Sequence, residues 1–420
     1  MTQSNQIRKP KIDRWVVLLY LFFLFVGLMA VYANSYDESF TGLINLKSNF
    51  GKQLIWAAIA LMLAQIISIT DSKFFTTIPA GFYIIISLTL LATLFIGHSV
   101  KGNKAWIEVG SFQFQPAEFA KVAAALMLAK YFSRDVNMKS NRIRLIALGI
   151  FLLPMLLVLL QGDAGSALVF ICFFFVLYRF GLPGWILVCG TYLIALFVFA
   201  LLIDKIILVS ILGGIGIITA AFFFRRRAVL ILIVIVIFCS AGFVFATDFV
   251  LNKVMKEHQR DRVLVMIGKK IDAKGVGYNV RQSMTAIGSG GLFGKGPLKG
   301  TLTRYNFVPE QSTDYIFCTI GEEYGFFGSA FLIGLFVVFI LRILMMAERQ
   351  RSTFSRVYAY AVASIFLLHL IINIGMTIGI MPTIGIPLPF ISYGGSSLFA
   401  FTMLLFILIK LDADRLSVLR

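Results

Sequence analysis

Charged residues are scarce in this chain of 420 residues. Only 14% are Asp, Glu, Lys or Arg, whereas 59% are hydrophobic. A soluble globular protein has roughly a quarter charged residues and about half apolar ones. The apolar excess is too large for one buried core, so much of it must face lipid. The composition therefore excludes an ordinary soluble enzyme and predicts a membrane protein.

Acidic residues and cysteines are also few. The 38 Lys and Arg residues outnumber the 20 Asp and Glu residues, which gives a formal net charge of +18. In a membrane protein this excess indicates basic cytoplasmic loops and attraction to anionic lipid headgroups, and we expect no nucleic-acid partner. The four cysteines lie in apolar runs without metal-ligand spacing, which argues against a disulfide framework. We predict no metal site and no certain cofactor, and a divalent cation is left open.

Apolar runs approaching or exceeding the roughly 20 residues that cross a bilayer recur along the chain. They predict an all-α polytopic protein with about twelve membrane helices, at 15–33, 54–70, 78–97, 117–130, 143–160, 164–180, 184–203, 206–224, 228–247, 315–341, 357–378 and 388–409. No A-x-A-like cleavage site follows the first run, which we expect to remain as a helix. Counting the short fourth run places the main basic clusters on the side of the N-terminus. By the positive-inside rule, both termini are then cytoplasmic.

One connection is much longer than the others. Residues 248–314 are basic and glycine-rich and contain no spanning run, and the predicted topology places them outside. A long ordered loop inside a compact domain is usually functional, and we expect short helices here at the membrane surface. Because apolar runs cover nearly the whole chain, we interpret residues 1–420 as a single integral domain.

Asp314 stands where this loop re-enters the membrane, in the segment VPEQSTDYIF at 308–317. Ionisable residues at membrane depth are costly and usually functional. The alternative is a helix N-cap, for which Asp is a favoured residue. Both roles are compatible, because a capping carboxylate keeps one oxygen free.

The run GSGGLFGKG at 288–296 allows two interpretations. Its backbone amides can form a phosphate-binding nest with Lys295 adding charge, or it can be a tight surface turn. Composition alone slightly favours the turn. The run is not a P-loop, because the order GxxxxGK[ST] is absent.

Further polar residues lie within or beside apolar runs. Glu118 and Lys121 are three residues apart on one helix face, where they either neutralise each other or line a polar cavity. Asp163 lies at a helix end predicted to be external. His369 and Asn373 are four apart, and a satisfied interhelical hydrogen bond is favoured over a catalytic base for this histidine.

The segment MPTIGIPLPFISYGG at 381–395 has three prolines and three glycines, which exclude a regular helix through its first half. Irregular backbone at membrane depth is tolerated where it lines a cavity or packs in protein. We therefore predict a cavity near the external face.

Four motifs in this order resemble the SEDS family (shape, elongation, division and sporulation), the RodA type more than the FtsW paralogue. They are QPAEFAK at 115–121, the glycine run at 288–296, PEQSTDYIF at 309–317 and PLPFISYGGSS at 387–397. The resemblance implies a ten-helix core, to which 206–247 adds an inserted helical pair. It also implies a peptidoglycan glycosyltransferase of the bacterial plasma membrane that polymerises lipid II during elongation and shape maintenance. The family's catalytic aspartate falls on Asp314. Other family positions fall on Glu118, Lys121 and Asp163, which we predict to be substrate-binding residues.

The implied substrate suggests roles for these residues. Asp314 would act as the base that activates a sugar hydroxyl, and direct attack would invert the anomeric centre. Lys104, Arg281 and Lys295 would stabilise the pyrophosphate leaving group, and Glu310 is a further carboxylate in the same loop. The implied partners are lipid II, a class B penicillin-binding protein and other membrane proteins of the elongation complex.

Two other function classes fit part of the sequence. Polar intramembrane residues and a broken helix also suit a lipid II flippase or another transporter. A structural scaffold for wall-synthesis partners is the third class. The unusual residues gather at the predicted external mouth instead of along a path through the midplane, which favours the enzyme.

Overall fold

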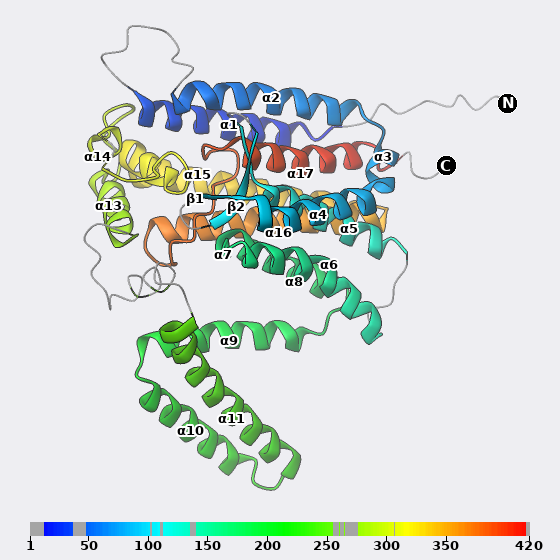
Figure 1. Ribbon diagram of the computed structural model, residues 1–420, viewed down its shortest axis with the longest axis vertical. Coiled ribbons are helices and arrows are strands. Elements are labelled where there is room, and N and C mark those ends of the chain that lie inside the picture. Colours follow the sequence, from blue (N-terminus) through cyan, green and yellow to red (C-terminus); the bar gives the residue numbers. More distant parts are fainter. Residues whose placement is uncertain are drawn as a thin grey trace, which may run out of the picture. The chain divides into compact units, whose positions relative to one another are not determined.

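The computed structural model describes residues 12–36, 48–100, 103–109, 112–134, 140–254, 276–305 and 307–416, with Arg260 and Leu264. The chain divides into two compact units, of which the first joins Met1–Gly181 to Asn279–Arg420 and the second is Leu182–Tyr278. Helices dominate both (Figure 1).

The first unit carries most of the helices and all the described strands. Its elements are α1 (Arg14–Ser35), α2 (Asn49–Ile69), α3 (Ser72–Thr77), α4 (Pro79–Ile96), β1 (His98–Val100), β2 (Asn103–Val109), β3 (Phe112–Phe114), α5 (Pro116–Phe132), α6 (Asn141–Leu160), α7 (Ala164–Val169), the 3-10 turn η1 (Phe170–Cys172), α8 (Phe173–Arg179), most of α13 (Val276–Ser289), α14 (Thr301–Arg304), α15 (Ile316–Glu348), α16 (Thr353–Thr377) and α17 (Gly395–Ala413). The second unit consists of α9 (Gly184–Leu202), α10 (Lys205–Phe222), α11 (Arg227–Phe249) and the π-helix η2 (Val250–Val254).

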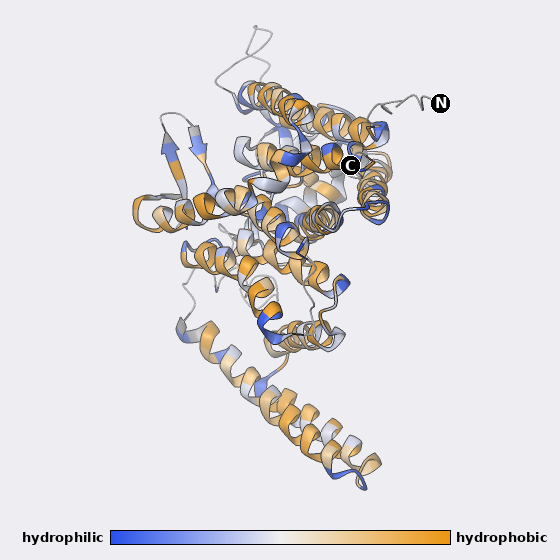
Figure 2. Ribbon diagram, turned by 90° about the vertical axis from the view of Figure 1, so that its right-hand side faces the viewer, coloured by the Kyte–Doolittle hydropathy of each residue, from blue (hydrophilic) through white to orange (hydrophobic). Residues whose placement is uncertain are grey.

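Each of the twelve predicted spans contains a helix, although the last one begins at Gly395 and not at residue 388. Among the described residues, ten helices are long and apolar enough to cross a membrane, namely α1, α2, α4, α6, α9, α10, α11, α15, α16 and α17. The other two predicted spans are α5, which is 17 residues long, and the shorter apolar run Ala164–Arg179, interrupted by η1. Apolar residues run along the length of these helices (Figure 2). The predicted all-α membrane fold is confirmed.

Helix starts follow local sequence signals. Pro116 opens α5, a position where its missing N–H costs nothing. The Ser48 hydroxyl accepts from Gly51 N at 3.1 Å to cap α2, and the Asp204 carboxylate accepts from Ile206 N at 2.8 Å to cap α10. These caps satisfy amides that have no partner inside their own helix.

The core of the first unit centres on α16 and α17. In their most apolar windows 72% and 78% of the residues are buried, against 11% in each of α9, α10 and α11. The helix α16 packs against α5, α8, α15 and α17. Phe390, from the connection between α16 and α17, lies among aromatic rings of four helices, namely Tyr20, Phe339, Phe366 and Phe401. This packing buries the connection among the helices at Phe390.

The connection from α4 to α5 contains a three-stranded antiparallel sheet that the sequence analysis did not predict. Its order is β1-β2-β3, with His98 opposite Trp106 and Ile107 opposite Phe114. Lys104 N donates to Gln161 O at 3.0 Å, which ties the sheet to the end of α6. Two of its strands are only three residues long, too short to show a clear alternation of apolar and polar residues.

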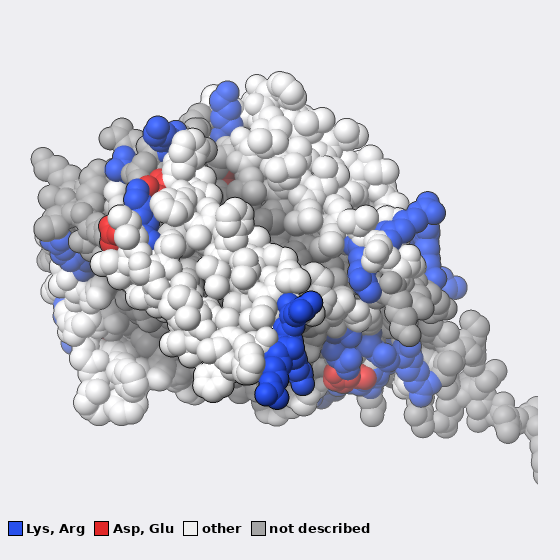
Figure 3. All heavy atoms as spheres, turned by 90° about the horizontal axis from the view of Figure 1, so that it is seen from below, with Lys and Arg blue, Asp and Glu red and all other residues white. Residues whose placement is uncertain are grey.

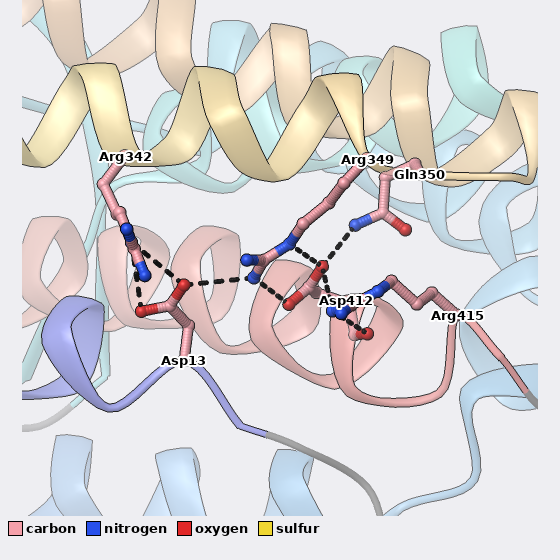
Figure 4. A network of polar contacts seen from close by, with 6 residues as sticks. All are labelled: Asp13, Arg342, Arg349, Gln350, Asp412 and Arg415. Carbon is pink, nitrogen blue, oxygen red and sulfur yellow. Dashed lines mark hydrogen bonds and ion pairs between the residues drawn. The ribbon is translucent and has the colours of Figure 1, made fainter.

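A network of buried charges joins three chain segments at one end of the first unit (Figure 4). Asp13, just before α1, pairs with Arg342 and Arg349 near the end of α15, both at 3.1 Å. Arg349 also pairs with Asp412 of α17, which accepts from Gln350 and Arg415 as well. The start of the first helix and the end of the last one therefore lie at the same end, called the Asp13 end below.

The second unit is held by a small apolar cluster and two polar contacts. Leu196, Leu208 and Val244 pack together from α9, α10 and α11. Tyr192 and Ser240 share a hydrogen bond of 2.8 Å, and Lys205 pairs with Asp248 at 2.9 Å. Within this unit the residues predicted as an inserted helical pair, 206–247, form α10 and α11.

Candidate active site around Asp314

Asp314 lies in a series of turns just before α15. Tyr315 occupies the N-cap position of this helix and makes no capping hydrogen bond with its side chain. Asp314 therefore stands one residue before the cap position that the sequence predicted for it. Its carboxylate instead faces the connection between α16 and α17, because a Cβ on Gly385 would lie 3.1 Å from Asp314 Oδ2.

The connection that faces Asp314 has no regular structure from 382 to 388. Gly385 has a φ of 72°, a conformation that other residues rarely adopt. Three hydrogen bonds tie the connection to the Asp314 segment. Ser392 Oγ donates to Thr313 O at 2.6 Å, and Tyr393 N donates to Ser312 O at 2.8 Å. The hydroxyl groups of Tyr315 and Thr383 share a hydrogen bond of 2.9 Å. Two motifs about seventy residues apart in sequence thus form one site, and the predicted break in the helix is confirmed.

Asp163, which precedes α7, lies beside the same stretch of the connection between α16 and α17. Its Oδ1 accepts from Ser166 N at 3.0 Å, and its Oδ2 accepts from Ser166 Oγ at 2.7 Å and Gln115 Nε2 at 2.9 Å. A Cβ on Gly165 would collide with the carbonyl oxygen of Ile384. Asp163 therefore lies beside Ile384 while Asp314 lies beside Gly385.

Glu118 and Lys121 form the predicted ion pair inside the protein. Lys121 Nζ lies 2.9 Å from both carboxylate oxygens of Glu118, and the two side chains are 0% and 2% exposed. Nζ also lies 2.9 Å from His369 Nε2 and 5.3 Å from the ring centre of Phe401. Both side chains are enclosed by protein. The pair can therefore influence the site only through the residues that it contacts, such as His369.

The glycine run docks into a break in α15, which is not helical at Gly325 (φ 67°, ψ −160°). Phe326 N and Phe327 N donate to Gly291 O and Leu292 O, at 2.9 and 3.1 Å. The carbonyls that a continuous helix would offer these amides, at Glu322 and Glu323, accept instead from Lys295 N and Gly296 N. The run thus replaces the missing helical hydrogen bonds of α15.

Glu322 reinforces this docking with its side chain. The buried carboxylate accepts from Lys295 Nζ at 2.6 Å and from Leu302 N and Thr303 N, both at 2.9 Å. The Lys295 charge is therefore balanced by Glu322. Of the two interpretations of the glycine run, the structure favours the tight turn, since two of its amides bond to α15.

The remaining predicted residues are at the surface around the site. Lys104 on β2 and Arg281 on α13 are exposed. Glu310 is exposed as well, in a turn with a φ of 59°, and Thr313 Oγ1 donates to its carboxylate at 3.2 Å. In the part of the chain that the structure describes, no three His, Cys, Asp or Glu side chains gather as a metal site.

Several polar residues of the site were missed from the sequence. Gln53 of α2 donates to Ser392 O at 3.4 Å and accepts from Gly394 N at 3.2 Å. Asn34 of α1 donates to Gln311 O at 3.3 Å and accepts from Thr319 Oγ1 at 3.0 Å. Their signal was the same as for Glu118: a polar side chain inside an apolar run.

Comparison with known proteins places the chain in a family. A family model for FtsW, RodA and SpoVE, described as cell cycle protein, matches residues 14–210 and 190–416. The peptidoglycan glycosyltransferase RodA of Treponema pallidum is 32% identical over 96% of this chain and 98% of that protein. The chain belongs to the FtsW/RodA/SpoVE family. The predicted SEDS membership is confirmed, since this is the same family.

Other members of the family support the RodA type. The peptidoglycan glycosyltransferase MrdB of Escherichia coli is 32% identical over 93% of this chain, and a probable FtsW of Coxiella burnetii is 30% identical over 92%. Crystallised RodA of Thermus thermophilus shares the fold, with a TM-score of 0.60 at 21% identity over 96% of this chain and 97% of that one. Family membership and the ten apolar helices together make this chain a multi-pass membrane protein.

Proposed function

We propose that this chain is a peptidoglycan glycosyltransferase that polymerises lipid II into glycan strands during cell elongation, with Asp314 as the base. Membership of the FtsW/RodA/SpoVE family and the names of its RodA and MrdB relatives support the activity. These names favour a polymerase over a flippase. The observation that carries the assignment of the base is the position of the Asp314 carboxylate against Gly385, in the irregular connection between α16 and α17.

The reaction requires a general base and no nucleophilic side chain from the protein. The acceptor is a sugar hydroxyl with a high pKa, and Asp314 takes its proton as it attacks the anomeric carbon of the donor. Such general base catalysis contributes typically 10²–10⁴-fold. Direct attack inverts the anomeric centre and requires no covalent enzyme intermediate.

The leaving group is a polyprenyl pyrophosphate and carries negative charge. Lys104 and Arg281 are exposed on segments of the first unit and are proposed to stabilise it. Lys295 adds positive charge, but it pairs with Glu322 at 2.6 Å. Its main role is therefore to hold the glycine run against α15. Asp163 and Glu310 are proposed to orient the two saccharides.

We propose that both termini are cytoplasmic and that residues 248–314 are external, with the whole chain forming one integral domain. The network at Asp13 and the site at Asp314 support this, because they lie at opposite ends of α1 and α15. Asp13 precedes α1 and contacts Arg349 after α15, whereas Asn34 near the end of α1 contacts Gln311 and Thr319. The basic residues Arg342 and Arg349 then mark the cytoplasmic end.

The proposed partner is a class B penicillin-binding protein, which cross-links the glycan, with other elongation proteins nearby. A chain from a peptidoglycan synthase complex that coordinates polymerization and crosslinking shares this fold, with a TM-score of 0.70 at 22% identity over 96% of this chain and 98% of that chain. The contact is proposed on the 248–314 segment, because the partner's catalytic domain is external.

The test of the activity is polymer formation from purified lipid II by the purified chain in detergent, with the partner added in a second reaction. We expect glycan strands in the reaction that contains lipid II and this protein. A transporter would move lipid II across vesicles and yield no strands under either condition, and that result would reject the proposal.

A further inference from the structure

Two buried polar side chains on one face of α16 hold the backbone that surrounds Asp314. Asn373 Nδ2 donates to Ile386 O at 2.7 Å and to Asp314 O at 2.9 Å. His369 lies one turn earlier, and its Nδ1 is 3.0 Å from Pro387 O. His369 and Asn373 are 1% and 0% exposed. One helix face therefore holds two successive carbonyls of the connection together with the carbonyl of Asp314 itself.

The contacts of His369 define its tautomer. A carbonyl oxygen can only accept, so Nδ1 carries the proton that is donated to Pro387 O. Nε2 is then the acceptor for the Lys121 ammonium, 2.9 Å away. Lys121 is fixed in turn by Glu118. The buried charges of α5 thus determine which ring nitrogen of His369 carries the proton. That nitrogen, Nδ1, donates to the connection at Pro387 O.

The connection needs such support because its backbone lacks the regular hydrogen bonds of a helix or strand. Residues 382–388 form no helix or strand, and Pro382, Pro387 and Pro389 have no N–H to donate. A carbonyl without a hydrogen-bond partner is energetically costly at membrane depth. Asn373 satisfies one such carbonyl and at the same time bridges it to Asp314, which fixes the distance between the Asp314 segment and Gly385.

We infer that His369 and Asn373 are positioning residues for Asp314, acting on the backbone of residues 386–387 and 314 without touching substrate. The inference rests on the proposed function, since it assumes that Asp314 is the base. It also gives Glu118 and Lys121 a role that their burial allows: they hold His369 in one tautomer. Displacing a catalytic group by about 1 Å costs up to roughly 10²-fold in rate. Loss of the hydrogen bonds from His369 or Asn373 should therefore lower kcat.

Two substitutions of His369 separate its two contacts. The amide nitrogen of Asn occupies the place of Nδ1, so His369→Asn keeps a donor for Pro387 O and removes the acceptor for Lys121. The amide of Gln reaches the place of Nε2, so His369→Gln keeps the acceptor and removes the donor. We expect opposite rankings: His369→Gln is the more thermally stable variant, and its kcat is lower than that of His369→Asn by roughly tenfold.

Asn373→Leu removes both donors of the second residue at similar size. We expect kcat to fall by roughly 10- to 100-fold, with the KM for lipid II unchanged within about twofold. The matched control is Tyr358→Phe, which removes a hydrogen bond of 3.2 Å to Leu404 O from a fully buried side chain of the same helix. Its kcat should stay within about twofold of the wild type, because this hydrogen bond goes to α17 and not to the connection or to Asp314.

Turnover is measured per molecule that elutes as a folded species and binds lipid II. Equal kcat values for His369→Gln and His369→Asn, or a wild-type kcat for Asn373→Leu, would overturn the inference. If Asn373→Leu does not fold, the two His369 variants decide alone. Asp314→Asn is assayed in parallel: full activity there rejects Asp314 as the base, whereas an inactive Asp314→Asn beside fully active His369 and Asn373 variants rejects only the positioning role.

Discussion

At the scale of single residues, one costly feature of the molecule is the charge buried on α5. The ammonium of Lys121 is surrounded by Glu118, His369 and the ring of Phe401. Removing one member of a buried ion pair leaves the other charge without compensation, and this costs more than the pair contributes. The pair was predictable from its three-residue spacing, whereas its contact with His369, 248 residues away along the chain, was not.

Lys121→Met should lower the free energy of unfolding by about 3–5 kcal/mol, because Glu118 is left as an unpaired buried carboxylate. The double variant Glu118→Gln/Lys121→Met should regain part of this loss. Thermal unfolding in detergent measures both.

Lys130→Met on the same helix is the control for this pair. Within the described residues its Nζ donates to Thr77 O, at 2.6 Å, near the surface. Its melting temperature should stay near that of the wild type. Equal melting temperatures for Lys121→Met and Lys130→Met would show that the Glu118–Lys121 pair is incidental.

At the scale of elements, the glycine run and α15 form one structural piece. Gly325 has a backbone conformation that is essentially restricted to glycine, and a Cβ there would meet Gly294 N and Leu292 O. The docked run leads to α14, and Gln311 Nε2 donates to Thr303 O at 2.6 Å, which continues the chain of contacts toward Asp314. The break in α15 therefore supports the Asp314 segment through the glycine run and α14.

Gly325→Ala should destabilise this piece by about 1–3 kcal/mol from backbone strain alone and release the glycine run from α15. Limited proteolysis of residues 288–303 and thermal unfolding report the two effects. Gly334→Ala is the matched control, because it lies in the same helix with nothing within 4 Å of its added Cβ. If both variants resist protease equally, the docking does not depend on the break.

The elements also show how far the sequence could be interpreted. Hydropathy located the ten long apolar helices, because lipid imposes a simple length rule. The short helix α5 was counted because the distribution of basic residues required it. The small sheet before α5 was missed, since strands as short as Phe112–Phe114 leave no periodic signal. The docking of the glycine run was also missed, because it depends on how two segments about thirty residues apart exchange backbone hydrogen bonds. Asp314 was found through its motif, but its contact with Gly385 required the fold.

At the scale of the whole molecule, extracytoplasmic polymerisation requires that Asp314 lie on the external side of the membrane. In a variant without the four native cysteines, Lys299→Cys should react with a membrane-impermeant maleimide added to intact spheroplasts, because Lys299 is exposed in the 248–314 segment. Arg351→Cys, exposed after α15 at the Asp13 end, should react only after permeabilisation. The opposite pattern would place Asp314 on the cytoplasmic side and rule out extracytoplasmic polymerisation.

The charge network at the Asp13 end holds the termini of three helices together in the same fold. Asp412 is fully buried and is contacted by Arg349, Gln350 and Arg415. Asp412→Asn leaves Arg349 with less compensation, so we expect a lower melting temperature with kcat per folded molecule near wild type. A strong loss of kcat without a change in melting temperature would mean that this end is coupled to the site at Asp314.

The most direct measurement of the central claim is strand formation from lipid II by Asp314→Asn. The substitution keeps the shape of the side chain and removes the carboxylate that accepts a proton. The account predicts a folded protein that binds lipid II and forms polymer at least roughly 10²-fold more slowly than the wild type. Glu310→Gln, four residues earlier in the same loop, is the comparison. Normal polymer from Asp314→Asn, with its loss in Glu310→Gln, would contradict the account and move the base to Glu310.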